Sequence, residues 1–425
     1  MTKRPFFAAL AAVAVSAASV AAEYVPTAEN LKARAAFADL GFGVFLHWGL
    51  YALPGQGEWY QSSADIDRDE YAKLQGAFNP AAFDAREWVK AIKAGGAKYI
   101  TFTARHHEGF SMFATRQNDY NVMRTSFGRD IVRELAAACR EEGLLFNLYY
   151  SLVDWHLDEY PLGDCPNKKG WDESKADYAK YHAFMKAQLE ELLTGYGPIG
   201  AIWFDGEWDH NPQTGFDWRF DELYTTIHAL QPACLIGNNH HHALFAGEDF
   251  QLIENTVRAG QTLDPNFPLE TCETMNGNWG YSIKDDRYKS VEELVRLLVR
   301  NAARGANLLL NIGPQPDGRL PAAALERLQG VGAWLERYGE TVYATKAGPV
   351  FADTDVVATR RGKTIFLHFL DARRTAFAFR CEAAVGSITT FDGVEVRFTQ
   401  ADGLVAFAPS ADSAAPDTIY RVILK

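Results

Sequence analysis

Ile199-Gly-Ala-Ile-Trp-Phe-Asp-Gly206 is an apolar run, rich in branched and aromatic residues, that ends abruptly in a carboxylate and a glycine. This pattern predicts a fully buried strand with Asp205 at its C-terminal end. In a parallel barrel, the C-terminal ends of the strands form the rim of the active site. A single aspartate after a strand is also common as a helix cap or turn residue. The functional interpretation of Asp205 therefore depends on whether other strands end in the same way.

Strand-like runs alternate with helical ones from Phe42 to about Tyr338. Apolar runs predict eight strands, at residues 42–46, 99–104, 145–150, 201–204, 234–237, 250–253, 269–272 and 307–312. Helical periodicity predicts helices at residues 85–94, 131–142, 176–193, 220–230, 291–303 and 322–338. Asp130 precedes one helix as an N-cap, and Ser290 precedes another with Glu293 three residues on, which is a capping-box pattern.

Eight strands with helical crossovers predict an α/β fold, a (β/α)8-like barrel. Between residues 238 and 269 three short strands leave little room for helices, so we expect a barrel lacking some outer helices there. From about Ala347, short strands at 356–359, 363–369, 375–379, 387–391, 394–398, 404–407 and 418–424 indicate a C-terminal antiparallel β-sandwich. Asp392-Gly393 and Asp402-Gly403 are hairpin turn signals within it. The expected domains are a catalytic barrel over residues 23–346 and the sandwich over residues 347–425.

The first 22 residues have the pattern of a signal peptide. Lys3 and Arg4 form a charged start, and the apolar run at residues 6–15 is too short to span a bilayer. Val20-Ala21-Ala22 offers small residues for cleavage before Glu23. An uncleaved anchor or a poorly packed N-terminal helix is the alternative. We expect an exported chain, periplasmic or secreted, with no membrane span after maturation.

The amino-acid composition limits the classes of protein and of partner that fit this chain. The chain has 425 residues, of which 48% are hydrophobic and 23% charged, enough for a large core. Its net charge of -12 and the lack of a basic stripe argue against nucleic acid as a partner. Aromatic residues make up 13%, which suits sugar binding, since flat rings pack against sugar C–H faces, or a large aromatic core. The five cysteines have no CxxC or zinc spacing, and one disulfide is possible.

The predicted strands end in carboxylates, imidazoles and indoles. In chain order the segments at these ends are His47-Trp-Gly49 with Glu58-Trp-Tyr60, Arg105-His-His-Glu-Gly109, Tyr149-Tyr-Ser151, Trp203-Phe-Asp205, Asn238-Asn-His-His-His242, Glu254, Glu270 at the start of its strand, and Asn278-Trp-Gly-Tyr281. In a barrel these segments converge on one pocket. Two carboxylates across a sugar are what glycoside hydrolysis requires, one as nucleophile or stabiliser and one as a proton donor with a raised pKa.

Eleven histidines raise the alternative of a metal-dependent hydrolase. Barrel hydrolases that bind zinc usually carry His-x-His at the first strand, whereas this strand runs into His47-Trp48-Gly49. His106 and His107 are adjacent, so we expect them to point to opposite sides of their strand and not to share an ion. The prediction is a site without a metal or a cofactor.

Seven motifs resemble those of the alpha-L-fucosidases of glycoside hydrolase family 29, over roughly residues 30–345. They are Phe42-Gly-Val-Phe-Leu-His-Trp-Gly-Leu-Tyr51, Glu58-Trp-Tyr60, Ala97-Lys-Tyr-Ile-Thr-Phe-Thr-Ala-Arg-His-His-Glu-Gly-Phe110, Tyr149-Tyr-Ser151, Ile202-Trp-Phe-Asp-Gly206, Leu269-Glu-Thr-Cys-Glu-Thr-Met-Asn276 and Asn307-Leu-Leu-Leu-Asn-Ile-Gly-Pro314. The resemblance implies a retaining exo-glycosidase that removes alpha-L-fucose from a fucosylated oligosaccharide or glycoconjugate through a covalent fucosyl-enzyme. It implies Asp205 as the nucleophile, and substrate-binding roles for His47, Glu58, Trp59, His106, His107, Tyr149, Trp203 and Trp279.

For the acid/base, the resemblance favours Glu254, and Glu270 is the competitor. A carboxylate at the C-terminal end of a strand faces the pocket mouth, whereas Glu270 begins its strand and is expected to lie deeper. Retention places the two catalytic carboxyl groups about 5–5.5 Å apart. Many family members carry an arginine shortly before the acid/base, where this chain has Asn238-Asn-His-His-His242. The rival interpretations are a non-catalytic sugar-binding protein, a metal-dependent hydrolase and a glycosidase of another specificity, such as a galactosidase.

Overall fold

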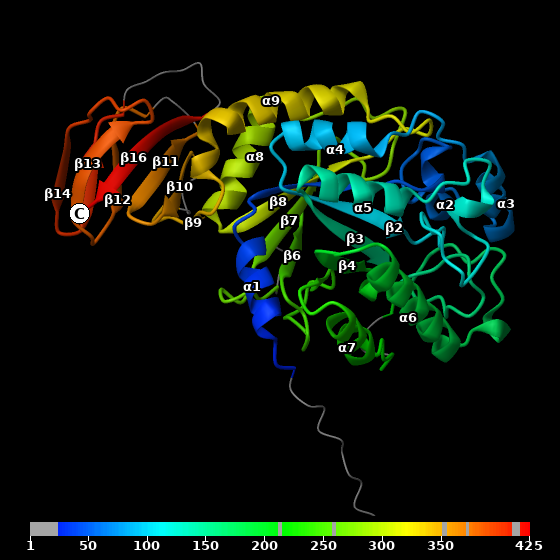
Figure 1. The fold of residues 1–425 in the computed structure, drawn as a ribbon. Helices are drawn as coiled ribbons and strands as arrows, with labels where there is room; N and C mark the ends of the chain where they lie inside the picture. Colours follow the sequence, from blue (N-terminus) through cyan, green and yellow to red (C-terminus); the bar gives the residue numbers. More distant parts are fainter. Residues whose placement is uncertain (1–23, 211–214, 257–260, 351–354, 371–373, 410–416) are drawn as a thin grey trace, which may run out of the picture.

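The computed structural model describes residues 24–210, 215–256, 261–350, 355–370, 374–409 and 417–425. The predicted signal peptide lies outside the described residues. The centre of the molecule is an eight-stranded, all-parallel sheet in the order β5-β4-β3-β2-β1-β8-β7-β6, curled into a nearly closed barrel (Figure 1). Its strands are β1 Phe42–Leu46, β2 Tyr99–Arg105, β3 Leu145–Ser151, β4 Ala201–Asp205, β5 Leu235–Asn238, β6 Gln251–Glu254, β7 Leu269–Thr274 and β8 Ala306–Ile312. All eight predicted strands are confirmed.

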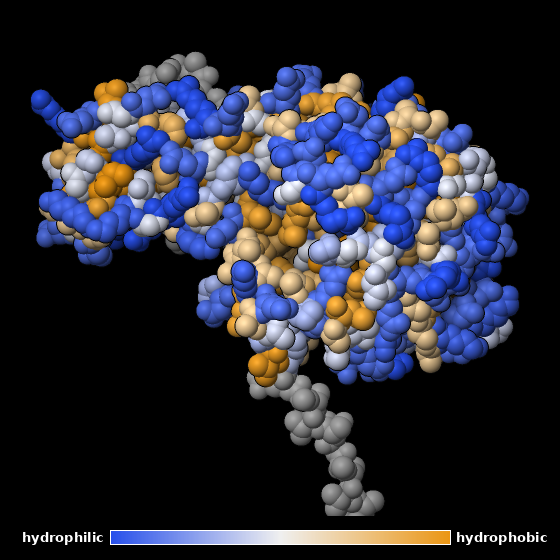
Figure 2. Space-filling model, viewed as in Figure 1, coloured by the Kyte–Doolittle hydropathy of each residue, from blue (hydrophilic) through white to orange (hydrophobic). Residues whose placement is uncertain are grey.

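Outer helices cover the barrel over most of its circumference. They are α4 Ala85–Ala94, α5 Ile131–Glu142, α6 Tyr178–Gly195, α7 Phe220–Leu230, α8 Val291–Ala303 and α9 Ala322–Tyr338. Asp130 caps α5, and Ser290 with Glu293 forms the predicted capping box on α8. The described residues between β5 and β7 contain no helix, which confirms the barrel with missing outer helices. Figure 2 shows a largely hydrophilic surface over α4 and α5, as expected for helices that bury one face.

Shorter helices lie in the loops and at the N-terminus. They are α1 Ala28–Phe37, α2 Tyr60–Ser63, α3 Arg68–Ala72 and the 3-10 turns η1 Leu50–Ala52, η2 Lys73–Ala77, η3 Val122–Arg124, η4 Glu173–Lys175, η5 Glu207–Asp209 and η7 Gly339–Thr341. Helix α1 was not predicted. It covers the N-terminal end of the barrel, where Phe37 packs on Tyr99 at 5.5 Å and on Phe250 at 4.8 Å between ring centroids. None of the described helices is both long and apolar enough to cross a membrane.

One aspartate bridges the unpaired edge between β5 and β6. The backbone N–H of Asp249 donates to the carbonyl of Ile236 at 2.7 Å, and its carboxylate accepts the N–H of the same residue at 2.8 Å. The carboxylate also contacts His228 from α7 at 2.9 Å and Arg34 from α1 at 2.6 Å. Asp249 therefore ties two helices to the strand edge that regular pairing leaves open.

Aromatic side chains fill the barrel interior. Phe45, Tyr99, Tyr149, Trp203 and Phe250 belong to one buried cluster beneath the C-terminal ends of the strands. Two glycines make room for these rings. A Cβ on Gly43 would lie 2.3 Å from the Tyr99 ring, and one on Gly237 would lie 2.4 Å from Phe250. The five cysteines are all buried, and none of them forms a disulfide.

The C-terminal segment forms the predicted antiparallel sandwich. One sheet has the order β13-β16-β11-β10-β9 and the other β12-β15-β14. The strands are β9 Lys346–Ala347, β10 Val356–Arg361, β11 Thr364–Phe369, β12 Phe377–Arg380, β13 Val385–Thr390, β14 Phe398–Ala401, β15 Leu404–Phe407 and β16 Thr418–Leu424. Asp402 and Gly403 have the positive φ angles, 51° and 70°, of the predicted hairpin turn between β14 and β15. The domain boundary at residues 346 and 347 stays a prediction.

The predicted strand at residues 394–398 is wrong. The turn at Asp392-Gly393 returns the chain to β13 through a single bridge, Thr389 with Glu395. The chain then crosses to the other sheet, where β14 begins only at Phe398.

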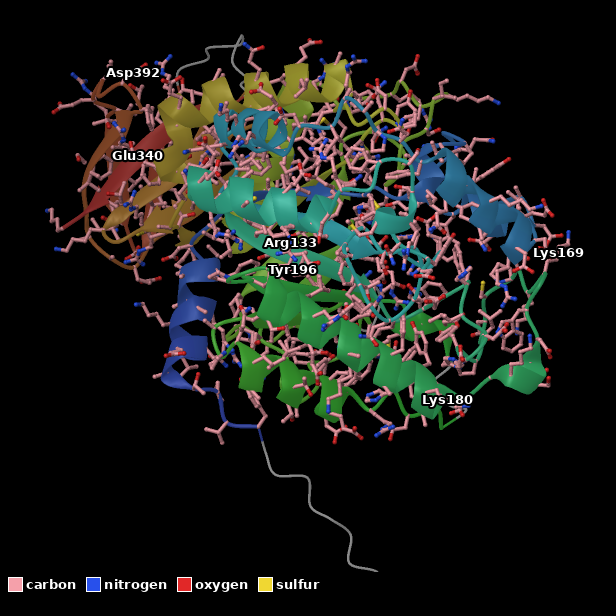
Figure 3. The ribbon with its side chains drawn as sticks, turned by 45° about the vertical axis from the view of Figure 1, so that its right-hand side comes forward. Arg133, Lys169, Lys180, Tyr196, Glu340 and Asp392 are labelled. Atoms are coloured by element: carbon pink, nitrogen blue, oxygen red, sulfur yellow. The ribbon has the colours of Figure 1, made fainter. Side chains whose placement is uncertain are left out.

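The sandwich packs against the end of α9 through charged and aromatic pairs (Figure 3). Arg337 donates to both carboxylate oxygens of Asp392, at 2.8 and 3.0 Å, and Glu340 pairs with Arg421. Arg421 lies over the Phe391 ring, 3.9 Å from its centroid. These contacts join the sandwich to the side of the barrel.

Candidate active site

A pocket of about 290 Å³ opens at the C-terminal ends of the barrel strands. All ten predicted site residues line it, and five others join them. The strands contribute Phe45, Tyr149, Trp203, Asp205, Glu254 and Cys272, and the segments after the strands contribute His47, Glu58, Trp59, His106, His107, Trp208, Asn239, His241 and Trp279. The barrel therefore brings together residues that are up to 234 positions apart, from Phe45 to Trp279.

Asp205 ends β4 and is held by several donors. Tyr149 donates its hydroxyl to Oδ2 at 2.9 Å, and the backbone N–H of Gly206 donates to Oδ1 at 2.9 Å. Asn239 donates to Oδ1 at 3.3 Å, and the Trp208 side chain donates a further hydrogen bond. Burial raises the pKa of Asp205, and these donors act in the opposite direction. The carboxylate is thus fixed in orientation while one face remains open to the pocket.

Glu254 ends β6 beside Asp205, and one amide links the two. Asn239 Nδ2 donates to Glu254 Oε2 at 3.0 Å as well as to Asp205 Oδ1 at 3.3 Å. Because both bonds meet at one nitrogen, the two oxygens lie no farther apart than the two bond lengths together. The two carboxylates therefore lie side by side in the pocket, and the separation of about 5–5.5 Å between them stays a prediction.

Glu270 lies beneath the pocket and does not line it. Its carboxylate is 0% exposed and receives the Tyr99 hydroxyl at 2.6 Å and Trp203 Nε1 at 2.9 Å. Burial raises its pKa to about 7. The expectation that Glu270 sits deeper than Glu254 is confirmed, and its enclosed position separates it from any leaving group in the pocket.

Glu58 is a third carboxylate in the pocket wall. Its Oε2 accepts the backbone N–H of Gly280 at 2.7 Å, so it ties the loop after β1 to the loop that carries Trp279. Burial raises the pKa of Glu58, and the Gly280 N–H opposes that effect.

Three of the four histidines that line the pocket are neutral rings. Burial lowers the pKa of His47 and of His107 to about 3 and that of His106 well below its usual value. His47 Nδ1 lies 2.7 Å from the Asn311 side-chain oxygen, so it donates there and leaves Nε2 as an acceptor. His107 Nδ1 lies 2.7 Å from Ser151 Oγ, whose own proton goes to a carbonyl, so His107 has the same tautomer. Both rings can therefore accept a hydrogen bond from a hydroxyl group.

The prediction that His106 and His107 point to opposite sides is wrong. Both line the pocket, with ring centroids 4.2 Å apart. Strand β2 ends at Arg105, so the alternation of a strand no longer applies to the two residues after it. Arg105 is fully buried, pairs with Asp154 and anchors this strand end. Within the described residues, no group of three or more His, Cys, Asp or Glu side chains has the arrangement of a metal site, and metal independence stays a prediction.

Aromatic faces form the remaining walls. Trp203 stacks on Tyr149, with centroids 5.5 Å apart and planes at 25°. Trp279 lies over His47 at 5.2 Å, and Trp59 packs against Trp208 at 5.4 Å. Such faces suit the C–H surface of a sugar ring.

The Asn238–His242 segment has a distinct role for each histidine. His240 is buried, with Nε2 3.0 Å from both oxygens of Glu248, and its Nδ1 accepts the His242 N–H at 2.9 Å. His241 turns into the pocket with a φ of 62°, an angle uncommon outside glycine. His242 is half exposed and lies 3.7 Å from Glu207.

Sequence reasoning did not name Phe45, Trp208 or Cys272 as pocket residues, and it included Asn239 and His241 only within the Asn238–His242 segment. Two of them carried a usable signal. Asn239 directly follows β5, and Trp208 follows Asp205 by three residues, so both stand just past a strand end. Phe45 and Cys272 lie within strands, where the sequence alone suggests only core packing.

The chain is similar to known proteins in sequence and in structure. The family model described as alpha-L-fucosidase matches residues 11–340. Human plasma alpha-L-fucosidase is 32% identical over 360 residues, covering 76% of this chain and 73% of that protein. Alpha-L-fucosidase isoenzyme 1 from Paenibacillus thiaminolyticus is 33% identical, with a TM-score of 0.84 over 93% of this chain and 100% of that one.

A third similarity concerns a trapped reaction state. A family GH29 alpha-L-fucosidase from Bacteroides thetaiotaomicron is 25% identical, with a TM-score of 0.81 over 93% of this chain and 96% of that one. That structure is a covalent intermediate trapped with 2-fluoro-fucosyl fluoride in a glutamate-to-glutamine mutant.

Proposed function

The chain belongs to the alpha-L-fucosidase family of glycoside hydrolases, and we propose that it is a retaining exo-enzyme that releases terminal alpha-L-fucose from glycans. The observation that carries this proposal is the Asn239 amide, which donates to both Asp205 and Glu254. The shared donor places the two carboxylates side by side, as a nucleophile and an acid/base that act on one glycosidic bond need to be.

In the first step, Asp205 attacks the anomeric carbon and forms a covalent fucosyl-enzyme. Glu254 gives its proton to the leaving oxygen as the glycosidic bond breaks. In the second step, Glu254 takes a proton from water, which attacks the same carbon and releases Asp205. The covalent intermediate trapped in the Bacteroides thetaiotaomicron relative supports this sequence.

The histidines and tryptophans bind the sugar in this scheme. The neutral His47 and His107 accept hydrogen bonds from sugar hydroxyl groups, and Trp203 and Trp279 cover the ring faces. The pocket volume of about 290 Å³ is at the low end for ligand sites, which suits one terminal sugar rather than an internal chain segment. We also propose that the chain is exported. Mass spectrometry of the protein isolated from each cell fraction would test whether it begins at Glu23.

The roles of Asp205 and Glu254 can be tested separately by the configuration of the product that forms when azide restores activity to each variant. The assay is the initial rate on an aryl alpha-L-fucoside, with and without chelator, for the wild type, Asp205→Ala and Glu254→Ala. Both variants should lose several orders of magnitude with poor leaving groups. In azide, Asp205→Ala should give a fucosyl azide of inverted configuration, because azide replaces the nucleophile. Glu254→Ala should give the retained configuration, because azide then attacks the covalent intermediate.

Glu270→Gln is the matched control, since it removes a carboxylate outside the pocket. Inverted azide product from Glu254→Ala, or an azide adduct from Glu270→Gln, would contradict the assignment. A wild-type protein without turnover on aryl or natural fucosides would point to the non-catalytic alternative, and loss of turnover in chelator would point to a metal-dependent one.

A further inference from the structure

Glu270 is a carboxyl group that the proposed mechanism does not use. It lies two residues before Cys272 on β7, on the same face of the strand, and Cys272 lines the pocket. Glu270 is therefore one layer deeper, and it is fully buried. None of the ion pairs among the described residues includes it, so no cation balances its charge.

Such a group is costly to bury. A carboxylate taken from water without a cationic partner loses its hydration and gains only the hydrogen bonds it accepts. Here there are two, one on each oxygen, from Tyr99 and from Trp203. The raised pKa, about 7, reflects the same cost. An apolar side chain would pack this position without that cost, but it would leave the Trp203 N–H without its acceptor.

Trp203, which donates its N–H to Glu270, connects Glu270 to Asp205. The indole N–H of Trp203 points down to Glu270, and its face stacks on the Tyr149 ring at 5.5 Å and 25°. The Tyr149 hydroxyl then donates to Asp205 at 2.9 Å. Phe45 packs edge-on against the indole, with ring centroids 5.3 Å apart. The single polar group that fixes the rotation of the indole within this apolar packing is therefore the bond to Glu270.

We propose that Glu270 is a positioning residue, which holds the Trp203 indole so that Trp203 and Tyr149 keep the sugar and Asp205 in register. This inference rests on the proposed function, because it deepens the role of the same pocket. Glu270 touches neither sugar nor reacting atoms. Its effect passes through the orientation of two pocket residues, and displacements of about 1 Å at such residues reduce rates about 100-fold.

The test compares Glu270→Leu with Glu270→Gln. Leucine removes the acceptor for the Trp203 N–H, whereas the glutamine amide oxygen can still accept it. For Glu270→Leu we expect kcat/KM on an aryl alpha-L-fucoside to fall about 10- to 100-fold and the affinity for L-fucose, measured by calorimetry, to fall about tenfold. For Glu270→Gln we expect kcat/KM and the affinity for L-fucose to stay within about threefold of the wild-type values.

Tyr99→Phe is the matched control for stability. It removes the hydrogen bond on the other oxygen of Glu270 and leaves the bond to Trp203 in place. Tyr99 does not line the pocket, so we expect its kcat/KM to stay within about threefold even where Tm falls. Equal losses of activity in Tyr99→Phe and Glu270→Leu would overturn the proposal, because they would indicate general destabilisation. Wild-type affinity and kcat/KM in Glu270→Leu would overturn it as well.

Trp203→Phe approaches the same hydrogen bond from the donor side and keeps an aromatic ring. We expect it to reproduce the loss in Glu270→Leu, and we expect the double variant to lose no more than Trp203→Phe alone. Additive losses would contradict a shared mechanism. The calorimetric titration needs no turnover, so an inactive wild type that binds L-fucose would refute the proposed reaction while the Glu270 comparison still decides this inference.

Discussion

Replacing Glu270 with glutamine should flatten the pH dependence of stability. Burial raises the pKa of Glu270 from its ordinary 4.5 to about 7. Between these values the folded protein keeps a proton that the unfolded chain has released, so the free energy of unfolding falls as pH rises. The contribution of Glu270 is complete below pH 4.5 and is lost as pH rises through about 7. Glutamine does not titrate, and the variant should not show this loss.

The magnitude follows from the two pKa values. Their difference corresponds to about 3 kcal/mol of unfolding free energy between pH 4.5 and pH 8. Because Glu270 is 0% exposed, solvent does not screen its interactions. Urea unfolding at a series of pH values gives the free energy for the wild type and for Glu270→Gln. The difference between the two curves should widen by about 3 kcal/mol in favour of the variant over this range.

Glu326→Gln is the control, since that side chain is 73% exposed on α9. Its curve should run parallel to that of the wild type. Parallel curves for Glu270→Gln and the wild type would refute the reasoning, because they would mean that Glu270 titrates alike in the folded and unfolded chains. The comparison uses slopes, so a constant change in packing or hydrogen bonding at residue 270 does not affect it.

Three further changes test the site and its support. Asn239→Ala removes the amide between Asp205 and Glu254, the proposed nucleophile and acid/base, and kcat/KM on aryl alpha-L-fucosides should fall about 10- to 100-fold with little change in Tm. An unchanged kcat/KM would contradict the role of the bridge. Arg105→Met leaves Asp154 buried without its cation and should cost about 3–5 kcal/mol in urea unfolding, and a cost below 1 kcal/mol would show that the pair is dispensable. Gly49→Ala places a Cβ 2.3 Å from Glu108 Oε1 and should lower both Tm and activity, whereas wild-type values would mean that the loop gives way easily.

The sequence predicted the barrel well because each element carries its own physical signal. Helices α5 and α8 show a 3.6-residue apolar period and begin at capping residues, so their bounds agree with the structure. Helix α1 has no such stripe, since only Asn30 and Phe37 among its residues are buried. Its local signals are the Thr27 cap, which accepts the Asn30 N–H, and Glu29 in the first turn, and apolar periodicity does not reveal it.

The site residues also fall into two groups, those that the sequence pattern predicts and those that depend on the three-dimensional structure. Residues at strand ends were predicted, because a parallel barrel places all of those ends on one rim. The Asn238–His242 segment was predicted to reach the pocket, but the sequence did not show which of its histidines faces it, because the position of His241 depends on a positive φ angle within a loop. Glu270 was expected to lie deeper than Glu254 because it begins its strand, and the register of β6 and β7 agrees with this. Glu254 lies opposite Cys272, which places Glu270 one layer below the pocket floor.

The charges of the pocket favour the reaction that the family implies. Among the described residues that line it are three carboxylates, no lysine and no arginine. Burial keeps three of its four histidines, His47, His106 and His107, neutral around neutral pH, since it lowers their pKa values far below 7. Cleavage of a glycosidic bond develops positive charge at the anomeric carbon. A site of fixed carboxylates and neutral acceptors stabilises that charge, whereas a protonated histidine beside Asp205 would oppose it. The burial that lowers the pKa values of His47, His106 and His107 therefore favours catalysis, because it removes three cations that the described lining could otherwise supply.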